Sequence, residues 1–334
     1  MAADRVLTAG ERGMITSIQH VGMTVPDLQV GKAFYELFGL ISHEQGQDLI
    51  FRCEGRDQDQ VRLMPGMKKR FSYVSFGTDE PGYAALLARL QAAEVATSDA
   101  QFGIGEGVWF QDPHGDWIHV AVAESAPSHA PLPPEVNAPG RYRRKGRACD
   151  ASTRAKKARP LRLGHIIKFS PDVDRSVDFY MNILGLKMSD RAGDVLAFLR
   201  GSAGGDHHIV AFAKSSHTGL HHMSFEVSDI DEIEIGAQTL LRAGYRDGFG
   251  LGRHVGGSNY FHYIRDPWDS LVEYFWDIDV IDADDDSWVP MNVTPEEVTA
   301  VWAATPPPPE FVMNFEEPDE TDVQGHVGPA APAL

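Results

Sequence analysis

The chain has 334 residues, and its 30 Lys plus Arg against 48 Asp plus Glu give a formal net charge of −18. Its 43% apolar and 10% aromatic residues suffice for a buried core, which excludes a largely disordered acidic protein. The charge also argues against a nucleic-acid partner, because general binding to phosphates needs a basic face.

The N-terminus and the cysteines predict the compartment. The opening residues MAADRVLTAGERGM contain no apolar signal segment, and no run of about 18 apolar residues occurs in the chain. Cys53 and Cys149 are too few for a disulfide framework and too far apart for a Cys-x-x-Cys site. We therefore predict a soluble, cytoplasmic protein with two free thiols and no membrane partner.

The first predicted unit begins at Ile18 with IQHVGMTVPDLQVGKAFYELFGL. It contains a short apolar strand, an aspartate that can cap a helix and a segment with helical periodicity, and the β-prone run VRLMP follows. The second unit begins with SYVSFGTDE, where Ser72 stands seven residues before Asp79, and it ends with WIHVAV after the turn Asp112-Pro113. Each unit therefore predicts the order βαβββ.

A linker is predicted over residues 125–160, which match neither unit. Five prolines precede a basic run, and the stretch from Arg141 to Arg162 carries a charge of +9. Because this stretch lacks interleaved aromatic residues apart from Tyr142, it favours an electrostatic contact within the protein over nucleic-acid binding.

The third unit, LGHIIKFSPDVDRSVDFYMNILGL from Leu163, repeats the first unit at an offset of 145 residues and places His165 on His20. The fourth unit contains HMSFEVSDID, in which His222 again stands seven residues before the aspartate that can cap a helix. This internal repeat predicts an α+β fold of four βαβββ modules, paired into two domains with mixed, curved β-sheets.

Residues 281–334 are predicted to form an acidic, proline-rich tail that partly docks on the body. From Asp277 onward the chain has fourteen acids and no Lys or Arg, so this stretch carries a charge of −14 and complements the linker. We expect the two segments to meet, within or between subunits. The body then divides into an N-terminal domain, residues 1–124, and a second domain, residues 161–280. Four aromatic residues of the tail are candidates for docking: Trp288, Trp302, Phe311 and Phe315.

The repeat allows equivalent positions in the two halves to be compared. Two strands of the second half begin near His165 and His222, and Glu273 stands seven residues after Asp266 of an Asp-Pro turn. Only the second half therefore presents two imidazoles and a carboxylate, the ligand set of non-haem Fe(II) sites that activate O₂. The alternative is that all three are ordinary polar strand residues. The corresponding positions of the first half hold His20, Ser72 and His119.

Three features together resemble the type I extradiol ring-cleavage dioxygenases of the vicinal oxygen chelate superfamily. They are the paired βαβββ units, the strand openings HIIKFSPDVD and HHMSFEVSDID, and the segment GRHVGGSNYFHYIRDPWDSLVEYF. The resemblance covers about residues 16–277 and is strongest from Leu163 to Trp276. It implies two vicinal oxygen chelate domains, the first without metal and the second catalytic.

The resemblance also implies a site and its chemistry. His165, His222 and Glu273 would ligate Fe(II), or Mn(II), which the same ligand set accepts. The substrates would be a catechol-type aromatic and O₂, with ring opening beside the diol, and the protein would be a homo-oligomer: a dimer, a tetramer or larger. Three further residues would act on the substrates: His208, His254 and Tyr263. The first half departs from this pattern at Ser72 and His119 and has Trp109 in place of the tyrosine.

Strand geometry distinguishes between adjacent candidates. Successive side chains of a strand point to opposite faces, so only one residue of each His-His pair can enter the site. The repeat favours His222 over His221, and the family spacing favours His208 over His207. For the same reason His262 is expected to face away from the site that its neighbour Tyr263 enters.

Two other functions fit the same fold class. The first is a metalloenzyme without O₂ chemistry, such as a glyoxalase-like isomerase or an epimerase, which typically draws ligands from both halves. Ser72 in the first half and the eight of fourteen histidines between His165 and His262 argue against it. The second is a module that binds an aromatic compound without metal, and such a module would not need Glu273.

Overall fold

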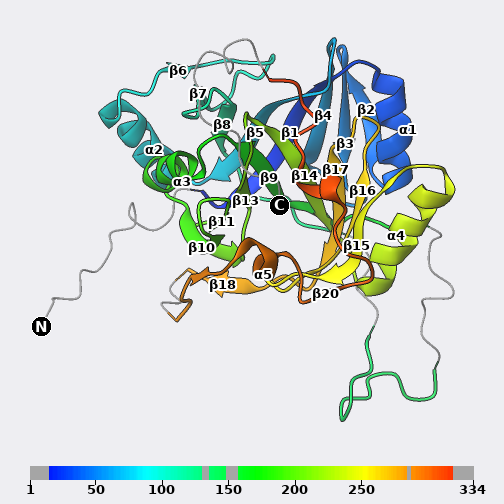
Figure 1. The fold of residues 1–334 in the computed structure, drawn as a ribbon. Helices are drawn as coiled ribbons and strands as arrows, with labels where there is room; N and C mark the ends of the chain where they lie inside the picture. Colours follow the sequence, from blue (N-terminus) through cyan, green and yellow to red (C-terminus); the bar gives the residue numbers. More distant parts are fainter. Residues whose placement is uncertain (1–14, 130–134, 148–156, 284–286, 319–334) are drawn as a thin grey trace, which may run out of the picture.

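The computed structural model describes residues 15–129, 135–147, 157–283 and 287–318, and two mixed, curved β-sheets form its centre (Figure 1). Four βαβββ units build these sheets, so the α+β class and the unit order are confirmed. The first half comprises β1 (Ser17–Val25), α1 (Leu28–Phe38), β2 (Ile41–Gln45), β3 (Asp48–Arg52), β4 (Asp59–Pro65), β5 (Arg70–Thr78), α2 (Glu80–Ala92), β6 (Thr97–Ser98), β7 (Val108–Gln111) and β8 (Trp117–Val122).

The second half repeats this order and adds the short strand β12. It comprises β9 (Arg162–Ser170), α3 (Val173–Asn182), β10 (Lys187–Ala192), β11 (Leu196–Arg200), β12 (Gly204–Asp206), β13 (Val210–Lys214), β14 (Gly219–Glu226), α4 (Ile230–Arg242), β15 (Asp247–Arg253), β16 (Tyr260–Arg265) and β17 (Leu271–Trp276). The tail follows with β18 (Val280–Asp282), β19 (Met291–Asn292), α5 (Pro295–Thr299), β20 (Trp302–Ala303) and the 3₁₀ helix η3 (Pro309–Val312).

In each sheet the first strands of two units lie side by side at the centre. The first sheet has the order β2-β3-β4-β1-β5-β8-β7-β6, and the second has β19-β10-β11-β13-β9-β14-β17-β16-β15-β20. The central pairs β1–β5 and β9–β14 are antiparallel, whereas the last strand of each unit pairs in parallel with the first. This order places β9, β14 and β17 side by side at the centre of the second sheet.

The four long helices begin where the sequence predicts them to begin. Each follows an aspartate whose carboxylate accepts backbone N–H groups of the first turn, which satisfies donors that have no partner within the helix. The capping residues are Asp27, Asp79, Asp172 and Asp229. Helix α1 ends at Gly39, whose φ of 119° and close approach to the Ala158 carbonyl, 2.4 Å from the position of a Cβ, require glycine.

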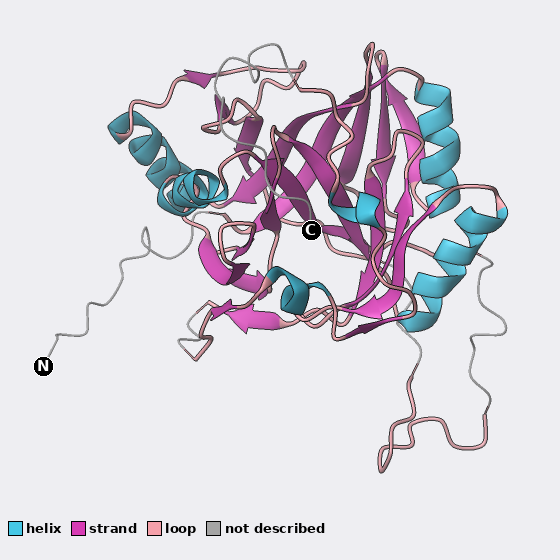
Figure 2. Ribbon diagram, viewed as in Figure 1, coloured by secondary structure: helices cyan, strands magenta, loops and turns pink. Residues whose placement is uncertain are grey.

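The helices lie outside the sheets, with α1 beside α4 and α2 beside α3 (Figure 2). These pairs join the two halves, because Phe34 of α1 lies 5.0 Å from the ring of Tyr245 after α4, and Arg89 of α2 donates to the Asn182 carbonyl of α3. The buried apolar core runs through both halves without interruption. The halves therefore fold against each other rather than as separate bodies.

The repeated tyrosines also connect the halves. Tyr180 of α3 donates to Asp112, in the Asp-Pro turn of the first half, at 3.4 Å. Tyr35, its equivalent in α1, lies beside Asp266 in the Asp-Pro turn of the second half, and burial together with that carboxylate raises the pKa of Tyr35 well above its usual value.

One equivalence drawn from the sequence is wrong by one residue. The strand registers place Ser75 and Ser224 at the same point of their sheets, and the residues two positions earlier are Tyr73 and His222. The first-half counterpart of His222 is therefore Tyr73 and not Ser72. Counting back from the capping aspartate misplaced it, because that aspartate lies four residues after the serine in the first half and five in the second.

The tail lies along the second sheet and reaches the first. Strand β19 pairs with β10 and β20 pairs with β15, so the tail covers both edges of the second sheet. Near the end of its described part, Glu316 forms a buried ion pair with Lys69 and accepts the backbone N–H groups of Phe71 and Leu220. The tail thus contacts both halves.

The expected contact between the linker and the tail is not seen among the described residues of either segment. There the basic residues Arg147 and Arg162 pair with acids outside the tail, and the tail's Glu317 pairs with Lys68. Residues 148–156, which include Cys149, lie outside the described residues, whereas Cys53 is buried and burial raises its pKa to about 12. No described helix is both long and apolar enough to span a bilayer.

Candidate metal centre

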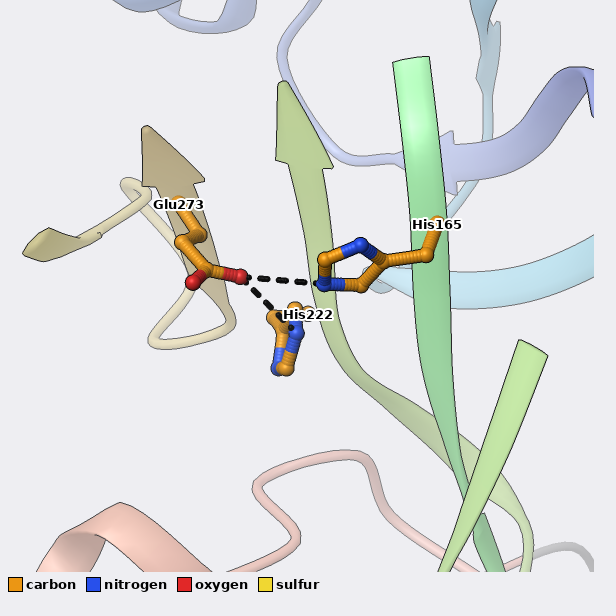
Figure 3. Close-up of side chains that lie close together, drawn as sticks. All are labelled: His165, His222 and Glu273. Atoms are coloured by element: carbon orange, nitrogen blue, oxygen red, sulfur yellow. Dashed lines mark hydrogen bonds and ion pairs between the residues drawn. The ribbon is translucent and has the colours of Figure 1, made fainter. Parts of the chain in front are cut away.

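Three neighbouring strands place His165, His222 and Glu273 on one face of the second sheet. Ser224 of β14 lies opposite His165 of β9 on one side and Glu273 of β17 on the other, and His222 is two residues away on the same strand. Since residues i and i+2 of a strand share a face, all three side chains converge on one place on this face of the sheet (Figure 3).

The three side chains offer their ligand atoms to a common centre. Glu273 Oε2 lies 3.2 Å from His165 Nε2 and 3.3 Å from His222 Nε2, and one ligand atom from each residue fits within 4.8 Å of the others. All three residues are at most 2% exposed. Among the described residues, no other group of three or more His, Cys, Asp or Glu side chains is arranged in this way.

The hydrogen bonding fits a bound cation. His222 Nε2 is buried without an aligned hydrogen-bond partner, although Glu273 lies nearby, and its Nδ1 is 2.7 Å from His221 Nδ1. A proton on Nδ1 leaves a lone pair on Nε2, directed at the carboxylate. A divalent ion between the imidazoles and the carboxylate would satisfy these atoms, because buried polar groups otherwise carry a large cost.

The electrostatics of the centre keep the carboxylate of Glu273 charged and the imidazole of His222 neutral. Burial alone would raise the pKa of Glu273, but hydrogen bonding to the imidazoles around it, that of His165 first, holds it well below its usual value. Burial lowers the pKa of His222 to about 4. A charged carboxylate and neutral imidazole are the forms in which these residues bind metals.

His254 and Tyr263 form a hydrogen-bonded pair beside the carboxylate. The Tyr263 hydroxyl lies 2.8 Å from His254 Nε2, which is 3.7 Å from Glu273 Oε1. The other ring nitrogen, Nδ1, is 2.6 Å from the carbonyl of Thr299 and must donate to it. In a neutral His254 the Nε2 therefore accepts a hydrogen bond from the Tyr263 hydroxyl. Burial first, and then the charge of Glu273, raise the pKa of Tyr263 well above its usual value.

His208 lies on the other side of the cluster, with its ring centre 4.1 Å from that of His165. Burial, reinforced by the imidazoles of His165 and His207, holds the pKa of His208 well below its usual value. The structure thus brings all six predicted site residues together.

His222 enters the cluster and His221 does not, but a β-bulge separates them rather than the simple alternation that we expected, since Leu220 pairs with Lys168 and His222 pairs with Ile167. His221 lies between Phe169 and Phe311 rather than at the cluster, and it reaches the site only through its contact with His222 Nδ1. His262 faces the helices, where its two ring nitrogens each lie 3.0 Å from a carboxylate, Glu234 on one side and Asp247 on the other.

His262 gives a prediction for stability against pH. Burial alone would lower its pKa, but Asp247 and Glu234 raise it to about 9. A raised histidine pKa stabilises the fold fully below about 6.5, and this contribution is lost as the pH rises through about 9. Urea unfolding should show His262→Gln less stable than wild type by about 1–2 kcal/mol at pH 6. The loss is smaller than the pKa shift alone would give, because Glu234 and Asp247 are partly exposed and solvent screens their interaction with His262.

The difference in unfolding free energy between wild type and His262→Gln should vanish near pH 10. Metal content is the control, and it should stay unchanged, because His262 lies on the outer face of the sheet. A stability difference that is independent of pH would contradict the assignment of this ion pair.

The sequence did not indicate three residues that support the cluster. Asn259, which is 1% exposed, directs its amide nitrogen to Glu273 Oε1 at 3.3 Å, and the Thr299 carbonyl comes from the tail. Asp190 lies 2.9 Å from the ring of His207, behind His208. The sequence could have indicated Asn259 through its place in the segment GRHVGGSNYF, near the predicted site residue His254. No feature of the sequence pointed to the Thr299 carbonyl or to Asp190.

Large aromatic side chains fill the equivalent place in the first sheet. Tyr73 packs edge-on against His20 with ring centres 5.5 Å apart, where the second half has His222 against His165 at 5.6 Å. Trp109 stacks on His119, whose two ring nitrogens both have hydrogen-bond partners. No imidazole nitrogen of His119 is therefore left for a ligand. Burial lowers the pKa of His20 to about 3.

Known proteins share this fold. A family model described as the Glyoxalase/Bleomycin resistance protein/Dioxygenase superfamily matches residues 162–274, the half that holds the cluster. Among solved structures, the Mn(II)-bound glyoxalase from Novosphingobium aromaticivorans has a TM-score of 0.75 at 24% identity, covering 92% of this chain and 96% of that one. The homoprotocatechuate 2,3-dioxygenase of Brevibacterium fuscum has a TM-score of 0.71 at 20% identity, covering 91% and 93%. These identities show the class of fold alone.

A closer relative defines the family within this class. Metapyrocatechase 2 of Cupriavidus necator is 37% identical over 312 residues, which are 92% of this chain and 95% of that protein. The chain therefore belongs to the extradiol ring-cleavage dioxygenase family of the vicinal oxygen chelate superfamily, which confirms the resemblance seen in the sequence.

Proposed function

We propose that the protein cleaves a catechol-type aromatic ring beside its diol, inserting both atoms of O₂, with Fe(II) held by His165, His222 and Glu273. The buried cluster of two imidazoles and one carboxylate carries this proposal. Such a set leaves several positions open on a divalent ion, as the binding of two reactants requires. The similarity to a metapyrocatechase over nearly the whole chain supports the same reaction.

The ion would supply positive charge and a template that holds both reactants. The protein supplies the hydrogen bonding around it. His254 and Tyr263 stand on the Glu273 side, where they would bind the diol oxygens, and the Tyr263 hydroxyl donates a hydrogen bond to His254 Nε2. His208 stands on the His165 side, where its imidazole would accept a proton from the diol and return it to oxygen. These groups are buried except for His254, whose side chain is 15% exposed, and their burial limits the access of bulk water.

In this proposal residues 161–280 form the catalytic metal domain and residues 1–124 a domain without metal. The aromatic side chains that fill the first sheet support this division. The proposal includes the homo-oligomer implied by the family resemblance, and sedimentation equilibrium of the purified protein tests it.

The competing function is a glyoxalase- or epimerase-like reaction without O₂, since a glyoxalase shares the fold. Enzymes of that kind typically draw metal ligands from both halves. Here all three candidate ligands come from β9, β14 and β17 of one sheet, which favours the dioxygenase.

The test starts from protein purified without oxygen and loaded with Fe(II) or, in parallel, Mn(II). A panel of one- and two-ring catechols is then added in air while O₂ uptake and visible absorbance are recorded. We expect uptake of one O₂ per catechol together with a yellow, muconic semialdehyde-type product. No turnover of any catechol with either metal would overturn the proposal, and catechol-independent isomerase activity would replace it with the competing function.

His208→Phe should separate metal binding from proton transfer. The variant removes the ring nitrogens but keeps a planar side chain against His165, so it should retain iron and bind catechol. Turnover should fall by about 10²–10⁴-fold, the range for a lost general acid or base. Stopped-flow kinetics and iron analysis measure both quantities.

His43→Phe is the matched control, because this histidine lies in the first sheet with its side chain 41% exposed, and turnover should not change. Loss of iron in the His208 variant would contradict the role given to this residue.

A further inference from the structure

A buried chain of three side chains leads away from the metal cluster. Its members are His208, His207 and Asp190. The two imidazoles approach each other through their Nδ1 atoms at 3.0 Å, and His207 Nε2 lies 2.9 Å from Asp190 Oδ2. All three residues are at most 3% exposed, so bulk water does not supply alternative partners. The carboxylate comes from β10 and the histidines follow β12, two segments that the proposed reaction does not otherwise use.

The carboxylate of Asp190 determines which nitrogen of each imidazole in this hydrogen-bond chain carries a hydrogen. A carboxylate accepts only, so the Nε2 of His207 carries a hydrogen and donates it. In a neutral His207 the Nδ1 is then an acceptor, and the hydrogen between the two imidazoles belongs to His208 Nδ1. His208 is left with a lone pair on Nε2, on the side of the ring away from His207. That ring lies against His165.

The surroundings hold the carboxylate and His207 in place. Asp190 Oδ1 accepts the Met291 N–H at 2.7 Å, where β19 pairs with β10. Trp288 covers the His207 ring with centres 5.2 Å apart and donates its indole N–H to the Ser189 carbonyl at 2.9 Å. The tail therefore fixes both the orientation of the carboxylate and the position of the imidazole it holds.

We infer that Asp190 and His207 are positioning residues, which fix the ring plane and tautomer of His208 so that its Nε2 faces the metal cluster as a hydrogen-bond acceptor. The inference rests on the proposed function only for what His208 acts upon. A carboxylate held behind an imidazole commonly sets the tautomer of a functional histidine, and here the carboxylate acts through a second imidazole.

Asp190→Asn tests the assignment sharply. Because Met291 N–H holds Oδ1, the introduced amide would turn its NH₂ group to His207 Nε2 and donate to it. The imidazole would then carry its hydrogen on Nδ1, donate to His208 Nδ1 and leave His208 with Nε2–H. The substitution therefore inverts both tautomers without removing a side chain.

The first readout is the ¹⁵N spectrum of the histidines in the metal-free protein. In the wild type, His207 Nδ1 and His208 Nε2 should have pyridine-type shifts, and in Asp190→Asn these shifts should move to His207 Nε2 and His208 Nδ1. The opposite pattern in the wild type would overturn the inference even if the variant did not fold. This readout does not depend on catechol turnover, so failure of the proposed function and failure of the inference are distinguishable.

The second readout is the kinetics of the metal-loaded protein. Asp190→Asn should lower kcat by about 10- to 100-fold, the effect of losing an outer partner of a functional group, with KM for the catechol and metal content little changed. Asp190→Glu, which keeps the carboxylate, should recover part of kcat. The matched control is Asp194→Asn, an exposed acid after the same strand that pairs with Lys214, and it should behave as wild type. An unchanged kcat in Asp190→Asn, or equal losses in the Asn and Glu variants, would overturn the positioning role.

Discussion

Glu273→Gln is expected to release the metal and abolish ring cleavage. The amide oxygen can keep the hydrogen bond from Asn259, which approaches Oε1, so the NH₂ group replaces Oε2. An N–H donor would then face the Nε2 atoms of His165 and His222, where the wild type presents the third ligand. Affinity for Fe(II) should fall by more than about 100-fold, because loss of a residue that only hydrogen-bonds to a metal ligand already costs up to about 100-fold. Elemental analysis and a competitive chelator measure it.

Glu234→Gln is the matched control for this substitution. Glu234 lies on α4 and contacts His262 on the face of the sheet that points away from the cluster. Its variant should keep full metal content and turnover. Thermal unfolding of both variants without metal shows whether the fold is intact. A Glu273→Gln protein that still binds iron at wild-type affinity would refute the ligand set.

The sequence indicated the fold and the positions of His165, His222 and Glu273 because these follow from periodicity, whereas His208, His254 and Tyr263 came from the family resemblance. A repeat of strand, capping aspartate and helix predicts four units, and the register of that repeat favours His222 over His221. The misplacement of Ser72 shows the limit of this reasoning. Register is set by hydrogen bonds between strands, so one residue less in the connection to Asp79 shifts the equivalence to Tyr73.

The supporting contacts could not be predicted for a different physical reason. Thr299 and Asp190 contact site histidines through a tail helix and a neighbouring strand, at sequence distances of 45 and 17 residues from His254 and His207. Neither periodicity nor spacing indicates which backbone carbonyl or carboxylate meets a ring nitrogen. Such contacts depend on how loops and edges close over a sheet, and only the structure shows that.

The difference between the halves follows from the same geometry. Both sheets place a first-strand histidine opposite a serine, His20 in one and His165 in the other. In the first sheet Tyr73 and Trp109 occupy the space between the strands, whereas the second sheet keeps smaller imidazoles there. The same strand arrangement thus holds packed aromatic side chains in the first half and a candidate metal site in the second.

Lys168→Met is expected to destabilise the protein by about 3–5 kcal/mol, because it leaves buried carboxylates without their cation. Lys168 of β9 is 1% exposed and lies on the face opposite the cluster. Its Nζ is 2.7 Å from Asp112 and 2.8 Å from Asp116, both in the turn before β8 of the first half. Methionine keeps the length of the side chain, so the loss should reflect charge rather than a cavity. Urea unfolding at pH 8 measures the change.

The pH dependence of this loss tests its cause. Burial is the main reason that the pKa of Asp116 is raised to about 7, although Lys168 opposes the shift, and removal of the cation should raise that pKa further. An acid with a raised pKa binds its proton in the folded state, so stability increases as the pH falls through that value. The loss of stability in Lys168→Met should therefore be smaller at pH 5 than at pH 8.

Lys214→Met is the control, because this lysine forms an exposed ion pair with Asp194. Its substitution should lower the stability by less than about 1 kcal/mol at either pH. A deficit of Lys168→Met that stays constant with pH would assign the effect to packing between the halves and not to the ion pair.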